Sequence, residues 1–200
     1  MIAVLDYGIG NLRSAEKALQ HLGSDASLVA DPEVAARAAA VVLPGVGNFG
    51  RCMCALRSSG LDRVAVEAVQ AGKPFLGICV GMQMLYEASE ESPAVPGLGV
   101  LRGRVVRLPD GVKRPQMQWN RLVLARPDHP MLAGLGAEPW VYFVHSYAAP
   151  AAEDTVAACE YGGPVVAAVA SGSVWATQFH PEKSGGTGLA LLANFVASVG

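Results

Sequence analysis

Cys79 is the residue whose surroundings most clearly favour chemistry, because a glycine stands two positions away on each side of it. The run Gly77-Ile78-Cys79-Val80-Gly81 follows an apolar segment and precedes residues with helical spacing. This pattern is typical of a nucleophile elbow, with sulfur in place of oxygen. An arbitrary cysteine is more often a small buried apolar residue. Here the glycines admit a strained turn and the helical N–H groups stabilise a thiolate or an oxyanion, which favours a nucleophile.

A cysteine nucleophile needs a base, and His180 is the histidine with the most useful neighbours. It follows the apolar run 174–179, and Glu182 comes two positions later. At the carboxyl end of a strand, His180 would face the crevice in which open α/β sheets bind ligands, and Glu182 would fix its tautomer. His-Pro-Glu alone is also typical of a surface turn, but with the cysteine elbow it predicts a triad. Of the other histidines, we expect His145 to line a pocket and His21 and His129 to lie on the solvated surface.

A second glycine-rich turn, Pro44-Gly45-Val46-Gly47, follows another apolar run. Glycines let a backbone present its N–H groups to a ligand with no side chain in the way. The turn is therefore a candidate for half of an oxyanion hole, for a phosphate cradle or for an ordinary tight turn. No Gly-Lys-Ser/Thr follows it, and the spacing is not Gly-x-Gly-x-x-Gly, which disfavours phosphate. Gly8-Ile9-Gly10 lacks the same features.

The composition excludes several classes of protein. Of the 200 residues, 52% are hydrophobic and 16% are charged, which is typical of a well-buried domain and not of a disordered chain. The 17 acidic residues outnumber the 15 Lys and Arg, and no basic cluster occurs, so neither nucleic acid nor a membrane surface is an expected partner. The longest uncharged stretch, 162–181, is broken by Gly, Pro and polar residues, unlike a membrane-spanning helix.

The cysteines favour a reducing compartment. They form no Cys-x-x-Cys pair and have no histidine at zinc-site spacing, so we expect no disulfide framework, no metal and no cofactor. No basic segment precedes the first apolar run, 2–5, so we expect no secretion signal. These features predict a cytoplasmic protein in which Cys52, Cys54 and Cys159 are structural or surface thiols.

Strands and helices alternate in the first half of the sequence. Unbroken apolar runs at 2–5, 41–43 and 75–79 are expected to form parallel strands that are covered on both faces. Helices are expected at 12–22 behind an Asn11 cap, at 61–69 and at 81–88, with a short exposed helix at 35–40.

The second half is rich in short strands. Such segments lie at 100–108, 122–125, 141–147, 156–161, 165–170 and 174–179, the last two as a hairpin, and a helix follows at 189–196. The order predicts a single three-layer α/β domain over residues 1–200, with a mostly parallel central sheet flanked by helices and an antiparallel strand-rich portion. Its site is expected at the carboxyl ends of the strands.

Two motifs together resemble the class I glutamine amidotransferases: 77–83, which holds the elbow, and Gln178-Phe179-His180-Pro181-Glu182-Lys183-Ser184. Segments 6–12, 44–47 and 142–147 narrow the resemblance to the glutaminase subunits of imidazole glycerol phosphate synthase, and it covers nearly the whole chain in order. The resemblance implies hydrolysis of glutamine to glutamate. It also implies that ammonia passes, within a heterodimer, to a (β/α)₈ cyclase that makes imidazole glycerol phosphate and an aminoimidazole carboxamide ribotide in histidine biosynthesis.

The resemblance also implies roles for single residues. Cys79 would attack the carboxamide of glutamine, His180 would carry the proton to ammonia, and Glu182 would hold His180. The implied oxyanion hole consists of Gly45, Val46, Gly47 and the N–H of Val80. The implied glutamine contacts are Gln83, Glu91, Ser146 and Tyr147, and the implied cyclase contacts are Asn11, Trp119, Asn120 and Lys183.

One stretch departs from the family pattern. The family carries a Pro-His-Met-Gly-Trp-Asn-like sequence, whereas residues 115–120 read Pro-Gln-Met-Gln-Trp-Asn, so Gln118 replaces a permissive glycine. This change predicts an altered loop conformation and partner geometry without affecting the thiol chemistry. Two alternatives remain open: a glutaminase partner of another synthase, such as pyridoxal phosphate or anthranilate synthase, and a non-catalytic scaffold with the same fold.

Overall fold

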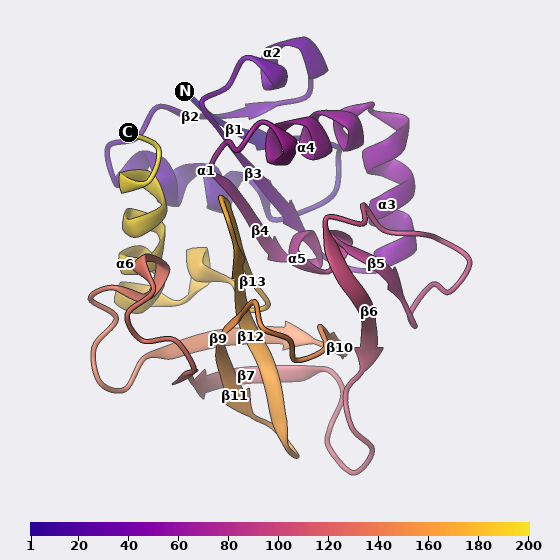
Figure 1. The fold of residues 1–200 in the computed structure, drawn as a ribbon, viewed down its shortest axis with the longest axis vertical. Helices are drawn as coiled ribbons and strands as arrows, with labels where there is room; N and C mark the ends of the chain where they lie inside the picture. Colours follow the sequence, from indigo (N-terminus) through magenta and orange to yellow (C-terminus); the bar gives the residue numbers. More distant parts are fainter.

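The central sheet is built from the apolar runs that the sequence predicts as buried strands. A computed structural model describes residues 1–200 and contains an eight-stranded mixed sheet (Figure 1). In their order across the sheet, the strands are β2 (Ala26–Val29), β1 (Ile2–Leu5), β3 (Ala40–Gly45), β4 (Phe75–Cys79), β13 (Val174–Thr177), β12 (Pro164–Ser171), β11 (Thr155–Glu160) and β8 (Val123–Leu124). The pairs from β2 to β13 are parallel, and the pairs from β13 to β8 are antiparallel.

Helices cover both faces of the parallel part, which is why β1, β3 and β4 are apolar throughout. The helices are α1 (Leu12–His21), α2 (Pro32–Ala36), α3 (Phe49–Ser58), α4 (Leu61–Gln70), α5 (Val80–Met84) and α6 (Gly185–Ala197), with short 3₁₀ helices η1 (Pro130–Leu132) and η2 (Pro181–Lys183). Helix α1 packs against β1, β2 and α6, whereas α4 packs against β3, α2 and α3. Figure 1 shows α4 in front of the parallel strands and α1 behind them, so the molecule has three layers.

Two small sheets extend the central one. Strands β10 (Tyr147–Ala148), β6 (Leu101–Arg107) and β5 (Tyr86–Ser89) form one, and β7 (Gln116–Arg121) pairs with β9 (Trp140–His145) in the other. We call the β7–β9 pair the ribbon. It runs across the lower part of the molecule in Figure 1, and β9 contacts η2, which follows β13. The ribbon therefore lies next to the carboxyl ends of the central parallel strands.

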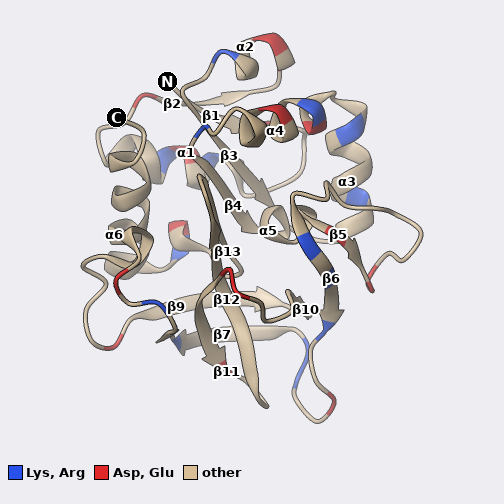
Figure 2. Ribbon diagram, in the orientation of Figure 1, with Lys and Arg blue, Asp and Glu red and all other residues tan.

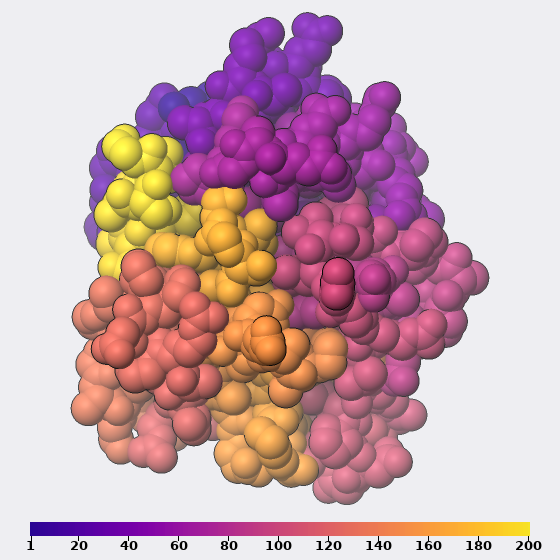
Figure 3. All heavy atoms as spheres, in the orientation of Figure 1, coloured from indigo at the N-terminus to yellow at the C-terminus, as the bar shows by residue number.

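The core is continuous from the first residues to the last helix. Buried apolar side chains from the central strands, all six helices and both small sheets belong to one cluster. Charged residues lie on helices, loops and outer strands, while β3, β4 and β13 carry none (Figure 2). In the space-filling view, α6 packs against the N-terminal half, and the ends of the chain lie near each other (Figures 1 and 3). The longest helix, α6, has 13 residues, and no helix has the length and apolar character needed to cross a membrane.

Several segments differ from the sequence-based expectation. The helix expected at 81–88 ends at Met84, because Tyr86–Ser89 pairs with β6 as a strand. The helix expected at 35–40 is Pro32–Ala36, and Ala38 and Ala40 are buried because the chain enters β3 there. Helix α3 and strands β2 and β7 were not expected. Short polar or mixed segments such as β7 lack the unbroken apolar pattern from which buried strands are predicted.

Candidate active site

Cys79 ends the central strand β4 in a conformation that side chains rarely adopt. Its φ of 55° and ψ of −112° make it the only non-glycine residue with a positive φ. Such strain costs about 1–3 kcal/mol and persists only where the surroundings enforce it. A Cβ at Gly81 would overlap the Leu43 carbonyl oxygen of the neighbouring strand, and a Cβ at Gly77 would come within 3.1 Å of Met82. Both glycines are therefore required by close backbone packing around the turn.

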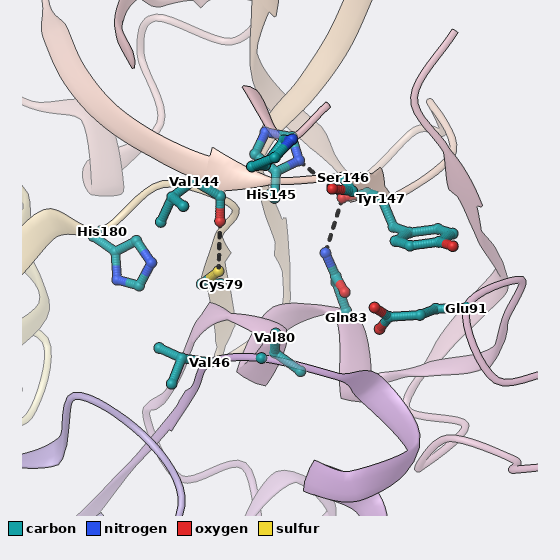
Figure 4. Close-up of a pocket in the computed structure, with 12 residues that line it drawn as sticks. Val46, Cys79, Val80, Gln83, Glu91, Val144, His145, Ser146, Tyr147 and His180 are labelled. Carbon is teal, nitrogen blue, oxygen red and sulfur yellow. Dashed lines mark hydrogen bonds between the residues drawn. The ribbon is translucent and has the colours of Figure 1, made fainter. Parts of the chain in front are cut away.

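A pocket of about 230 Å³ lies above this turn. This volume is below the range of about 300–1,000 Å³ that is typical for drug-sized ligands, so it suits a molecule as small as an amino acid. The lining residues are Val46, Gly47, Cys79, Val80, Gln83, Glu91, Pro115, Val144, His145, Ser146, Tyr147 and His180. Figure 4 shows His180 on one side of Cys79 and Glu91 on the other side, beyond Gln83.

His180 and Glu182 form a buried hydrogen-bonded pair beside Cys79. The Nδ1 of His180 lies 2.8 Å from Oε1 of Glu182, and their side chains are 1% and 2% exposed. Because a carboxylate can only accept a hydrogen bond, the hydrogen of this contact is on Nδ1 of His180. The second ring nitrogen, Nε2, is buried and has no hydrogen-bond partner in the protein. The ring points towards Cys79 (Figure 4). The structure therefore brings together the cysteine, the histidine and the acid that the sequence analysis selected.

The charges around His180 favour its protonated form. Burial by itself lowers the pKa of His180, but hydrogen bonds and charge interactions with Cys79 and Glu182 outweigh burial and raise the pKa to about 10. An imidazolium beside a cysteine favours the thiolate over the thiol. The electrostatics of the site therefore favour a positively charged imidazole next to the Cys79 sulfur.

Asn11 supports this pair and does not cap α1 as the sequence predicts. It occupies the N-cap position, but its side chain accepts no hydrogen bond from the backbone N–H groups of the helix. Instead, Nδ2 of Asn11 donates to Oε1 of Glu182 at 3.2 Å, and the hydroxyl of Ser14 donates to Oδ1 of Asn11 at 2.9 Å. The buried carboxylate needs a donor more than the exposed end of the helix does, since water can satisfy the latter.

The residues expected to form an oxyanion hole lie along one edge of the pocket, with one exception. Val46, Gly47 and Val80 line the pocket, whereas Gly45 does not. Gly45 is the last residue of β3 and pairs with Cys79, and a Cβ there would come within 2.8 Å of the Gly81 nitrogen. The close packing of the β3 backbone against the backbone of α5 therefore explains why position 45 is a glycine.

Two buried donors hold the carbonyl groups of this glycine-rich turn. The hydroxyl of Tyr7 donates to the Pro44 carbonyl at 2.6 Å, and the thiol of Cys52 donates to the Val46 carbonyl at 3.2 Å. Burial raises the pKa of Tyr7, and burial likewise raises the pKa of Cys52 to about 11, so both groups keep their hydrogens at neutral pH. Because the C=O and N–H of a trans peptide point in opposite directions, the Gly47 N–H points away from Cys52.

The residues expected to contact glutamine surround the rest of the pocket. Gln83 lines the pocket and is only 3% exposed. Both of its N–H groups are used, by the Tyr147 carbonyl and by Gln178, each at 2.9 Å, which leaves its oxygen for a ligand. Oε2 of Glu91 accepts from the Phe49 N–H at 2.6 Å, which fixes a carboxylate at the far end of the pocket. A carboxylate at that position can bind the ammonium group of an amino acid.

The remaining histidines do not share the geometry of His180. His145 lines the pocket, and its Nδ1 is 2.8 Å from the Tyr147 carbonyl; burial lowers the pKa of His145 to about 4, so it is neutral. His21 is exposed, as expected. His129 is partly exposed: it packs edge-on against Trp175, and its ring accepts from the Met131 N–H.

Sequence reasoning missed two contacts to the Cys79 sulfur. The amide of Gln178 donates to Sγ at 3.7 Å. The Cys79 thiol lies 3.9 Å from the Val144 carbonyl oxygen (Figure 4). Gln178 is fully buried although it carries a polar side chain. A polar residue within the otherwise apolar run 174–179 was the signal that could have identified it. No local signal exists for a backbone carbonyl such as that of Val144.

The residues expected at the partner contact lie on and near the ribbon. Trp119 is 49% exposed, Lys183 is exposed, and Asn120 donates to the Glu160 carbonyl at 2.9 Å. The altered stretch is a regular strand and not a loop, with Gln118 opposite Phe143 in β9, so a glycine is not required for its backbone. The change to Gln118 therefore leaves the local backbone regular.

No group of three or more His, Cys, Asp or Glu side chains has the geometry to hold a metal ion. All four cysteines are free thiols. The polar side chains that line the pocket carry one thiol, two imidazoles, one carboxylate, one amide and two hydroxyl groups. This set suits acyl transfer through a thioester.

Comparisons with known proteins agree with this chemistry. A family model described as Glutamine amidotransferase class-I matches residues 3–199. The chain is 49% identical to the imidazole glycerol phosphate synthase subunit HisH of Methylococcus capsulatus, over 98% of this chain and 95% of that protein. The HisH subunit of Methanothermobacter thermautotrophicus is also 49% identical, with 98% of each chain covered.

Solved structures have the same fold. A glutamine amidotransferase crystal structure is 25% identical and has a TM-score of 0.77 over 98% of each chain. The structure of PurLQS from Thermotoga maritima is 21% identical, with a TM-score of 0.73 over 98% of this chain and 97% of that chain, a likeness of fold alone. Because the family model spans nearly the whole sequence and relatives at 49% identity match it from end to end, the chain belongs to the class I glutamine amidotransferases and, among them, to the family of the imidazole glycerol phosphate synthase subunit HisH.

Proposed function

We propose that residues 1–200 form one glutaminase domain that hydrolyses glutamine and passes ammonia to a partner cyclase subunit with a (β/α)₈ barrel. The cyclase would use the ammonia to make imidazole glycerol phosphate and an aminoimidazole carboxamide ribotide in histidine biosynthesis. The names of the relatives at 49% identity support the synthase, since they are subunits of imidazole glycerol phosphate synthase. The cytoplasm is the proposed location, because the four cysteines are free.

In the first half of the proposed reaction, the Cys79 thiolate attacks the side-chain carbonyl carbon of glutamine. The C–S bond forms, and the carbonyl electron pair moves to oxygen, where N–H groups of Gly47 and Val80 stabilise the negative charge. His180, which is protonated because its pKa is raised to about 10, gives its Nε2 proton to the amide nitrogen. The C–N bond then breaks, ammonia leaves and a thioester remains on Cys79.

In the second half, neutral His180 takes a proton from water as the water oxygen attacks the thioester carbon. The C–S bond breaks, glutamate leaves, and the thiolate and the imidazolium are restored. Glu182 keeps the Nδ1 hydrogen of His180 in place throughout, so that Nε2 always faces the reacting atoms. The net reaction is glutamine plus water to glutamate plus ammonia.

One observation supports this proposal most strongly: Cys79 has a strained positive φ within a pocket that also contains buried His180 and the Glu91 carboxylate. A scaffold without catalysis has no need to maintain that strain. The pocket also suits glutamine, because Cys79 and the Glu91 carboxylate lie on opposite sides of Gln83 (Figure 4), where they would face the carboxamide and the ammonium group of the substrate.

The test is a glutaminase assay on the chain purified together with the cyclase of its own organism, with and without the cyclase ligand. Glutamate release is expected to rise in the presence of the ligand-bound cyclase. The Cys79→Ala variant is expected to lose at least about 10³-fold in turnover, because Cys79 is the only thiol that lines the pocket. Cys54→Ala is the matched control, since it makes the same change at an exposed thiol of α3 and should retain turnover.

Other outcomes identify the alternatives. Stimulation by a different synthase, with no response to the cyclase, would assign the chain to that synthase. An electrophilic glutamine analogue that fails to label Cys79 even in the complex would support a non-catalytic scaffold. Full turnover in the Cys79→Ala complex would refute the proposed nucleophile.

A further inference from the structure

We propose that the side-chain amide of Gln178 is a catalytic hydrogen-bond donor to the Cys79 sulfur and that Gln83 is the positioning residue that keeps this donor in place. The inference deepens the glutaminase proposal above and rests on it for the role of the thiolate. It adds Gln178, for which the sequence motifs indicated no role, to the groups that act on the reacting sulfur. It also gives Gln83 a second role besides contact with a substrate.

The sulfur of Cys79 has one donor and one acceptor near it in addition to His180. Nε2 of Gln178 lies 3.7 Å from Sγ, and the Val144 carbonyl oxygen lies 3.9 Å from it. A neutral thiol has a hydrogen and can donate it to the Val144 carbonyl oxygen. A thiolate has only lone pairs, so the Gln178 N–H is the partner that suits the ionised form, and a hydrogen bond to the charged form favours that form.

The orientation of the Gln178 amide follows from the bond on its other side. Its Oε1 accepts from Nε2 of Gln83 at 2.9 Å, and the same Gln83 amide donates to the Tyr147 carbonyl at 2.9 Å. If the Gln178 amide were flipped, its NH₂ would face the NH₂ of Gln83 and its oxygen would face the sulfur. Two donors in contact and an oxygen against a thiolate are both unfavourable, so the network allows only one orientation.

Burial makes this contact strong and keeps it rigid. Gln178 is fully buried and Gln83 is 3% exposed, so water does not compete for their hydrogens. The backbone of Gln178 is also anchored, since its N–H donates to the Ala167 carbonyl of β12 at 2.8 Å. A hydrogen bond to a charged group is stronger in a buried site without water than at the protein surface. Hydrogen bonds thus connect Tyr147 of β10 to Gln83, Gln83 to Gln178, and Gln178 to the sulfur of Cys79. We call this series of hydrogen bonds the relay.

The test measures how the alkylation rate of Cys79 by iodoacetamide depends on pH, by peptide mass spectrometry of the full chain. This reagent is a small carboxamide, it reacts with the thiolate, and peptide mapping separates Cys79 from the exposed Cys54. The Gln178→Met variant keeps the length of the side chain and removes the donor. The midpoint of its profile is expected to rise by about one to two pH units, because the deleted hydrogen bond favours the charged form of the sulfur.

Two further variants keep the test decisive. Gln178→Glu is nearly isosteric and retains an acceptor for Gln83, but it places an acidic oxygen where the N–H was, so its midpoint is expected to rise further than that of Gln178→Met. Gln83→Met removes the lock on the Gln178 amide and is expected to shift the midpoint upward by less. If Gln178→Met fails to fold, Gln178→Glu alone decides the question.

The chain offers a matched control. Nε2 of Gln116 also lies 3.7 Å from a buried sulfur, that of Cys159, so Gln116→Met deletes the same kind of contact outside the relay. Its Cys79 midpoint should equal that of the wild type. Unshifted midpoints in Gln178→Met or Gln178→Glu, with lower thermal stability alone, would show a merely structural role and overturn the proposal. Shifted midpoints in a chain without glutaminase turnover would instead refute the proposed function and leave the donor role of Gln178 intact.

Discussion

His180 is held at one ring nitrogen by Glu182 and faces Cys79 with the other, and all three groups are almost completely buried. Burial disfavours any charge, yet the two acidic neighbours favour a proton on the imidazole. The second effect is larger, because the pKa of His180 is raised to about 10 and not lowered. At the scale of single residues, the His180 imidazolium and the Glu182 carboxylate therefore form a buried pair of opposite charges that stabilise each other away from water.

This raised pKa predicts a pH-dependent stability. The folded chain retains the His180 proton up to about pH 10, while the unfolded chain loses it near 6.5, so the contribution of His180 is fully present below pH 6.5 and is lost as the pH rises to about 10. The difference in free energy of unfolding between wild type and His180→Gln should shrink across this window. The slope should be at most about 1.4 kcal/mol per pH unit, the value for one proton. Urea denaturation at several pH values measures it.

His21→Gln serves as the control, because it changes an exposed histidine of α1 that touches none of these groups. The difference between wild type and this variant should not follow the same profile. A difference for His180→Gln that stays constant or grows from pH 6.5 to pH 10 would contradict the charged pair.

At the scale of elements, the site depends on how closely α5 approaches β3. Gly81 lies in α5, and a Cβ there would overlap the backbone carbonyl oxygen of Leu43, which cannot rotate away. The turn at Cys79 and the glycine-rich turn after β3 are brought together by this contact. Both turns contribute residues to the pocket lining, among them Gly47 and Val80.

Gly81→Ala is therefore expected to destabilise the chain by about 1–3 kcal/mol or more, because overpacking against backbone cannot be relieved by a rotamer change. Gly186→Ala is the matched control at the start of α6, since its Cβ would meet nothing within 4 Å. It is expected to stabilise the chain by up to about 1 kcal/mol, the difference between Ala and Gly in a helix. Chemical denaturation of both variants measures the contrast, and a similar loss in both would refute the packing argument.

At the scale of the whole molecule, the ribbon presents apolar side chains to solvent next to the pocket. Met117, Trp119 and Trp140 are 62%, 49% and 50% exposed, and Trp119 stacks at a tilt on Tyr142 across the two strands. Large exposed aromatic residues that lie together are typical of interfaces. Val144, on the same strand as Tyr142 and Trp140, lines the pocket, so a partner bound on the ribbon would lie close to the pocket that contains Cys79.

The proposed cyclase contact predicts that Trp119→Ala weakens binding of the cyclase by about ten-fold or more, as expected for an aromatic side chain at the centre of an interface. Val123→Ala is the control, because Val123 is 56% exposed on β8 at the edge of the central sheet. Isothermal titration calorimetry with the cyclase measures both dissociation constants. Equal affinities for wild type and Trp119→Ala would place the contact elsewhere.

Much of this molecule was determined by its sequence alone. The elbow at Cys79, the buried strands β1, β3 and β4 and the β12–β13 hairpin are local patterns, because glycine spacing and unbroken apolar runs act on neighbouring residues. The position of His180 and Glu182 after the last central strand was predicted for the same reason. The resemblance to a known family added the residues that surround the pocket.

Other features were decided only by the tertiary structure. Gln178 meets the sulfur of a residue 99 positions away, and Asn11 meets Glu182 across 171 positions. Neither contact has a local signal, because the direction of a side chain depends on strand register and helix packing. The Asn11 side chain does not form the helix cap that its local sequence favours. A buried carboxylate without a hydrogen-bond donor costs more free energy than uncapped N–H groups at an exposed helix end, which water can satisfy. The packing of distant segments therefore determines which side chains contact the reacting groups, whereas the local sequence determines which residues are the reacting groups.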